Sequence, residues 1–181
     1  VTTDVELKKQ LAPAHFNQPM VTRAPAVLTF CADFSRFSQW CKLRKAEPGY
    51  DNFQSFMASA IDALIFAQTF AVAAESNGLG ICYLGTTTYN AQEIIETLKL
   101  PKLVVPVTIT VGFPADNPPI TDRLPLESVV HHQTYKPFTE QDINQLYAEK
   151  ENSAFYQQFT AENNKETLEQ GGALQKTVMF V

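Results

Sequence analysis

A long apolar helix, a glycine break and a short strand follow one another directly in this chain, and this succession constrains the fold most. Residues 62–85 read DALIFAQTFAVAAESNGLGICYLG. Apolar residues at helical spacing predict a helix over residues 51–76, which Gly78 would end in the left-handed conformation. One face carries Phe53, Phe56, Met57, Ala60, Leu64, Ala67 and Ala74. The remaining faces are also mostly apolar, apart from a thin polar stripe. We therefore expect a central helix that is buried on both sides.

Shorter elements are predicted before and after this helix. Continuous apolar runs at residues 26–32 and 103–113 predict two buried strands, and residues 81–84 predict a short third strand. Val129 and Val130 suggest a last short strand. Helices are expected at residues 4–11 with Asp4 as N-cap, at 34–45, at 91–98 with Asn90 as cap, and at 139–150, where Thr139 and Asp142 form a variant capping box.

The composition narrows the classes of function. A chain of 181 residues is long enough for one domain with a sizeable core. Charged residues make up 18% of the chain, less than the typical quarter or so, and a dimer partner would cover the surface that is left apolar. The formal net charge of −5 argues against a nucleic-acid partner, because no basic stripe could neutralise a phosphate backbone.

Cysteine usage and hydropathy indicate a cytoplasmic protein. The three cysteines are scattered and form no CxxC pair, which is typical of reduced thiols. No signal peptide is recognised in the sequence. The longest apolar run, at residues 60–74, is interrupted by Asp62, Gln68 and Thr69, so no membrane span is predicted.

Few side chains form a pattern that is typical of catalysis. His131 and His132 are adjacent, so at a strand end they would point to opposite faces and could not share a metal ion. The sequence has no metal-binding histidine motif and no GxSxG turn, and the GLG at residues 78–80 is not a dinucleotide fingerprint. Arg123 could bind a phosphate in bidentate fashion, or it could be a solvated loop arginine. These patterns alone predict an α+β or α/β domain that forms a dimer.

A set of separate motifs, taken together, resembles the nitroreductase family. The motifs are FCADF at residues 30–34, DALIFAQ at 62–68, AAESNGLG at 73–80, YLG at 83–85, LKLP at 98–101, GFPADNP at 112–118 and RLPLESVVH at 123–131. Their order and spacing match over residues 1–140, and the similarity is greatest to the large oxygen-insensitive NADPH nitroreductases and flavin reductases.

The resemblance implies a fold, a cofactor and an assembly. The expected fold is α+β, a nitroreductase-like mixed β-sheet flanked by helices, with the long central helix at a dimer interface. The family members are homodimers that hold FMN at this interface and use NAD(P)H as co-substrate. The implied activity is the reduction of nitroaromatics, quinones or flavins by hydride transfer in two steps through flavin N5, with no catalytic side chain required.

The resemblance also implies positions for the flavin ring. Gln18 matches a glutamine that reaches the isoalloxazine ring of FMN. The turn whose backbone N–H groups face flavin N5 and O4 matches Tyr83, Leu84, Gly85 and Thr86. Glycine in that turn lets the backbone approach the ring closely.

The positions implied for the FMN phosphate match less completely. Arg123 matches the second basic residue of a Lys-x-Arg pair, and Thr121 stands at the first. We expect residues 1–181 to form a single nitroreductase-like domain that lacks the family's N-terminal segment and, after about Tyr156, its C-terminal arm. The alternative hypothesis is therefore a truncated, non-catalytic domain that dimerises or binds flavin without turnover.

Overall fold

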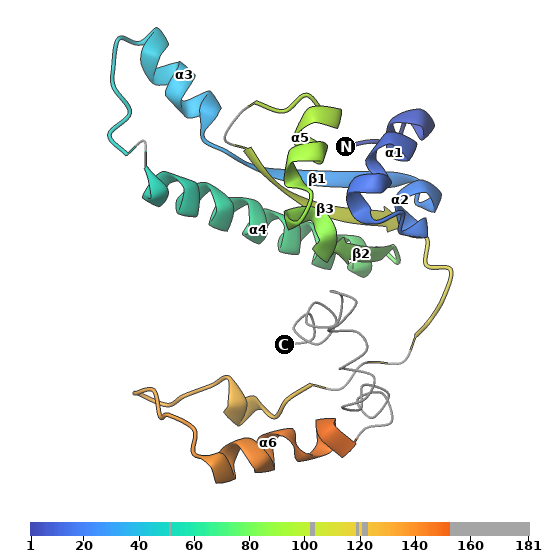
Figure 1. Ribbon diagram of the computed structural model, residues 1–181, viewed down its shortest axis with the longest axis vertical. Helices are drawn as coiled ribbons and strands as arrows, with labels where there is room; N and C mark the ends of the chain where they lie inside the picture. The colour runs from blue at the N-terminus through green and yellow to red at the C-terminus, as the bar shows by residue number, and fades with distance from the viewer. Residues whose placement is uncertain (51, 102–103, 119, 121–122, 153–181) are drawn as a thin grey trace, which may run out of the picture. The chain divides into compact units, whose positions relative to one another are not determined.

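The structure is a computed structural model that describes residues 1–50, 52–101, 104–118, 120 and 123–152 (Figure 1). It divides into two compact units, Val1–Asn117 and Pro118–Val181. Two expectations fall outside the described residues, namely Thr121 at the phosphate position and the C-terminal arm after Tyr156.

The first unit is built on a three-stranded sheet. The strands β1 (Ala26–Asp33), β2 (Gly80–Leu84) and β3 (Val104–Gly112) lie in the order β1-β3-β2. Both neighbouring pairs are antiparallel, and Ile109 on the central strand lies opposite Leu28 on one side and Tyr83 on the other. The three predicted strands are thus confirmed to within two residues, and so is the α+β class. The expected sheet is mixed, whereas the sheet of the described residues is antiparallel throughout.

Helix α4 (Phe53–Ser76) covers one face of this sheet (Figure 1). Its first turn is capped by Asn52, whose side chain accepts a hydrogen bond from the Gln54 N–H at 2.9 Å. Gly78 ends it with φ at +76°, and the Leu79 N–H donates to the Ala74 carbonyl, as expected for a glycine cap. The core below the helix contains Phe30, Ala67 and Ile109.

The burial of α4 differs from the prediction. Its buried residues are small, namely Ser55, Ala63, Ala67, Ala71 and Ala74. They allow close approach to the sheet, and the larger side chains of Ile61, Leu64, Ile65, Phe66 and Val72 are 48–64% exposed in the single chain. Within the described residues α4 is the helix that is long and apolar enough to cross a membrane by length and composition. We interpret it as a helix of the folded unit because its small-residue face packs on the sheet.

Short helices cover the opposite face of the sheet (Figure 1). They are α1 (Val5–Leu11), the 3-10 turn η1 (Pro13–His15), α2 (Pro19–Arg23) and α5 (Ala91–Thr97). Their core includes Leu11, Val21 and Ile94 with Val27 and Leu84 of the sheet. Asp4 caps α1 as predicted, through a 2.7 Å hydrogen bond from the Leu7 N–H.

The prediction for Asn90 is corrected in its detail. Asn90 is at the N-cap position of α5, but its side chain makes no cap hydrogen bond. Its Nδ2 donates instead to the Ala14 carbonyl at 3.0 Å, which joins α5 to η1. The tertiary acceptor has replaced the local one that the sequence pattern indicates.

The remaining helices are also close to their predicted positions, whereas the last strand is not formed. Helix α3 (Ser35–Leu43) follows β1 in the first unit. In the second unit, α6 (Glu140–Asn152) begins with the predicted reciprocal bonds between Thr139 and Asp142. The strand expected at Val129 and Val130 is wrong, because the N–H groups of both residues bond back to Leu126 in the turn η3 (Leu126–Ser128).

Candidate functional site

The predicted flavin-facing turn begins where β2 ends. Tyr83 and Leu84 are the last strand residues and, as neighbours on a strand, point to opposite faces. Leu84 is buried in the core under α1, α2 and α5. Tyr83 is 41% exposed, and its hydroxyl donates to Oε1 of Gln68 on α4 at 3.0 Å. Partial burial raises the pKa of Tyr83, with a smaller contribution from Glu75.

The chain then forms the 3-10 turn η2 (Gly85–Thr88), in which two hydroxyl side chains are buried. Thr87 Oγ1 donates to the Leu84 carbonyl at 2.7 Å, which closes the turn onto the strand. Thr86 is 5% exposed, and its hydroxyl contacts the side chain of His15, which precedes Gln18 in the sequence. The first N–H groups of such a turn have no acceptor within it, so the backbone here is suited to bind an electron-rich atom.

Gln18 lies just before α2, after a sharp reversal of the chain. Phe16 and Asn17 both have left-handed backbone angles, with φ of 52° and 54°. Such angles are uncommon for residues other than glycine and indicate that the surrounding contacts hold the reversal in place. Oε1 of Gln18 is buried and has no hydrogen-bond partner among the described residues. Because a buried acceptor without a partner costs about 1–3 kcal/mol, this atom is suited to a ligand that donates a hydrogen bond.

His15 connects these two segments, and the sequence analysis did not identify it. The side chain is fully buried, and its Nδ1 lies 3.2 Å from Thr86 Oγ1, although the two residues are 71 positions apart. Its other nitrogen, Nε2, is buried without a partner in the described part of the chain. Burial lowers the pKa of His15, so the ring is neutral at pH 7. A lone histidine in a turn carries no periodic signal that would have indicated this contact.

The lowered pKa of His15 predicts that acid destabilises the first unit. An unfolded histidine titrates near about 6.5, so below that pH the unfolded chain binds a proton that the folded chain does not. The contribution of His15 to the free energy of unfolding should therefore be fully present above about pH 6.5. On acidification the free energy of unfolding should fall, by at most about 1.4 kcal/mol per pH unit. Urea unfolding between pH 5 and 7.5 measures the slope. His15→Asn should flatten it, and an unchanged slope would contradict the assignment to His15.

The structure places the six predicted site residues in two units. Gln18, Tyr83, Leu84, Gly85 and Thr86 belong to the first unit, where His15 joins the Gln18 segment to the turn. Arg123 is an exposed residue of the second unit. Its role at the FMN phosphate therefore stays a prediction.

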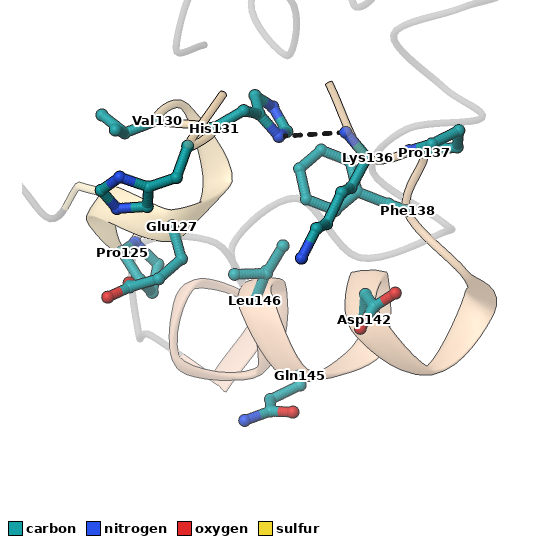
Figure 2. A pocket seen from close by; sticks show the side chains of 11 residues that line it. Pro125, Glu127, Val130, His131, Lys136, Pro137, Phe138, Asp142, Gln145 and Leu146 are labelled. Carbon is teal, nitrogen blue, oxygen red and sulfur yellow. Dashed lines mark hydrogen bonds between the residues drawn. The ribbon is translucent and has the colours of Figure 1, made fainter. Parts of the chain in front are cut away.

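The second unit has a cavity of about 510 Å³, which contains none of the predicted flavin-site residues (Figure 2). His131 lies in its wall, with its ring 4.6 Å from that of Tyr135 and 5.5 Å from that of Phe138. The His131 Nδ1 accepts a long hydrogen bond of 3.5 Å from the Lys136 N–H. Within the described residues no cluster of histidine, cysteine or carboxylate side chains could hold a metal ion.

Comparisons with known proteins identify the family. The sequence model of the nitroreductase family matches residues 2–113. An oxygen-insensitive NADPH nitroreductase of Salmonella typhimurium is 39% identical over 139 residues, which cover 76% of this chain and 56% of that protein. An FMN reductase of Bacillus subtilis that uses NAD(P)H is 36% identical over 167 residues, or 91% of this chain and 64% of that protein.

A solved structure shows the same fold. A candidate oxidoreductase of Bacteroides fragilis superposes with a TM-score of 0.86 and is 57% identical, with coverage of 93% of this chain and 69% of that one. The chain belongs to the nitroreductase family, so the resemblance and the nitroreductase-like fold are both confirmed. The chain spans somewhat more than half the length of the two relatives named above, at 56% and 64%.

Proposed function

We propose that this chain forms part of an FMN-dependent NAD(P)H oxidoreductase that reduces nitroaromatics, quinones or flavins. The family membership and the names of the two relatives, a nitroreductase and an FMN reductase, support this class of activity. The observation that carries the proposal is the buried Oε1 of Gln18, which has no partner in the described structure and belongs to a segment joined to the turn at Thr86.

The residues of this site fit an isoalloxazine ring. The ring presents an N–H donor between carbonyl acceptors, and an amide side chain such as that of Gln18 can accept from the one and donate to the other. The backbone of the turn at Gly85 and Thr86 offers N–H groups to electron-rich ring atoms, and glycine permits close approach. Arg123 would bind the phosphate of FMN through its paired N–H donors.

The protein's contribution to the chemistry is binding and orientation. FMN, when bound, supplies the centre at N5 that accepts and donates hydride in the two half-reactions. N–H donors of the turn would be aimed where negative charge develops on the ring, and they need not reorganise during the reaction. Tyr83, a titratable residue of β2 close to the turn, already bonds through its hydroxyl to Gln68. No side chain is therefore assigned as a general acid or base.

The proposed functional form is a homodimer in the cytoplasm, and the exposed side of α4 supports the dimer. Ile61, Ile65 and Val72 are 48–61% exposed on a helix whose opposite side is buried against the sheet. A row of large apolar side chains of this kind is typical of a surface that another protein covers. A second copy of the chain, with its own α4, would supply an equally apolar surface.

Flavin titration tests the proposed function. The purified chain should bind FMN with a change in flavin absorbance and fluorescence, and Gln18→Ala should weaken binding about tenfold, as expected from the loss of one to two neutral hydrogen bonds. Gln92→Ala is a matched control, because Gln92 is exposed on α5 and bonds to Glu96 at 2.8 Å. A chain that binds no FMN at excess cofactor would contradict the proposal and favour a non-catalytic domain.

A further inference from the structure

We propose that His15 is a positioning residue of the candidate flavin site, an inference that rests on the proposed function. Its ring holds the turn Gly85–Thr88 and the segment with Gln18 in a fixed relation, through the hydroxyl of Thr86. His15 itself has no exposed surface. It acts through the two segments that it joins.

On the Gln18 side, the backbone transmits the position of His15 directly. The N–H of Gln18 donates to the carbonyl of His15 at 3.1 Å, and the N–H of Asn17 donates to Ala12 at 2.8 Å. The left-handed angles of Phe16 and Asn17 make this a tight reversal with little room to move. The location of Gln18 is therefore set by the location of His15.

On the turn side, two long-range hydrogen bonds hold the same stretch of chain. His15 Nδ1 lies 3.2 Å from Thr86 Oγ1, and four residues further on Asn90 Nδ2 donates to the carbonyl of Ala14 at 3.0 Å. Adjacent residues of η1, Ala14 and His15, thus contact both the beginning of η2 and the residue before α5. This pair of contacts fixes the turn relative to the reversal, not only relative to strand β2.

The unsatisfied atoms near the reversal support a site there, although the hydroxyls of Thr29 and Thr108 on the sheet also have no partner among the described residues. Buried polar atoms in native proteins are nearly always bonded, yet His15 Nε2 and Gln18 Oε1, within four residues, have no partner among the described residues. If the pair of His15 and Thr86 served packing alone, apolar residues of the same shape could replace both of them at little loss. In this chain one ring nitrogen of His15 contacts the turn, and the other has no partner among the described residues.

Local hydrogen exchange in the flavin-free chain tests the coupling. His15→Gln moves the polar atom away from the Nδ1 position, and Thr86→Val removes the hydroxyl, so each should raise amide exchange in fragments covering residues 12–22 and 80–90 together, about tenfold. His15→Asn keeps a polar atom near Nδ1 and should restore the wild-type rates. Thr2→Val is the matched control, since Thr2 is a buried threonine that lies outside both fragments.

The outcomes separate this inference from the proposed function. If either variant leaves both fragments unchanged, or raises exchange equally in α4, His15 has no positioning role. If FMN binds, His15→Gln and Thr86→Val should each weaken FMN binding by a similar factor. The double variant should bind FMN no more weakly than either single variant. Additive losses would also overturn the inference. If the wild-type chain binds no FMN, the proposed function fails, while the exchange data still decide whether the two segments are coupled.

Discussion

Ile65→Glu is expected to convert the proposed homodimer into a monomer. Ile65 is 61% exposed on α4, on the side away from the sheet, so in a dimer its side chain would enter the contact between subunits. A glutamate there would have to lose its water without an opposite charge beside it, which costs several kcal/mol. We expect the dimer to weaken more than about 1,000-fold, equivalent to about 4 kcal/mol. Sedimentation velocity at micromolar concentration measures this change.

The folded single chain should tolerate the same substitution. The carboxylate of the monomeric variant would remain in water, so its urea unfolding should differ little from that of an isolated wild-type chain. Val5→Glu is the matched control, because Val5 is 57% exposed but lies on α1, away from the α4 surface. If Ile65→Glu sediments as a dimer, or if the wild-type chain is monomeric, the α4 surface is not the dimer contact that we propose.

Local sequence patterns were sufficient to predict most of the elements. The caps of α1 and α6 and the end of α4 depend on side chains within a few residues of the helix end, namely Asp4, Thr139 with Asp142, and Gly78. The strands β1 and β3 are continuous apolar runs, as expected for a sheet covered on both faces. Such short-range signals are present in the sequence whatever the rest of the chain does.

Features that depend on tertiary contacts were not predictable in the same way. Helical periodicity shows that α4 is apolar nearly all round, but it does not show that the sheet selects the side with Ala63, Ala67 and Ala71. The amide of Asn90 bonds to a carbonyl 76 positions earlier in the sequence rather than capping its own helix. Val129 and Val130 are too few to indicate a strand against the competing turn at Leu126.

The candidate site shows the same division. Gln18 and residues 83–86 were predicted from the family resemblance, which depends on motifs along the chain. The contact of His15 with Thr86 joins residues 71 positions apart and has no motif of its own, so it is visible only in the fold. Arg123, in the second unit, is a site residue by resemblance alone.

Ile109→Ala is expected to destabilise the first unit by about 2–5 kcal/mol, the usual cost of removing a large aliphatic side chain from a packed core. Ile109 has no exposed surface and lies at the centre of β3, in the core that Phe30 and Ala67 form between the sheet and α4. Ala67 cannot extend to fill the space, and the paired strands on both sides prevent β3 from shifting. The midpoint of urea unfolding measures the loss.

The size of this loss depends on whether α4 packs on the sheet as described. The same substitution at Ile120, which is 98% exposed, removes the same atoms without leaving a cavity and should change stability by less than about 0.5 kcal/mol. If both variants lost equally little, the small-residue side of α4 would not face Ile109. The proposed dimer surface is defined as the side of α4 that the sheet leaves uncovered. In that case the exposure of Ile65 would have a different cause and would not identify this surface.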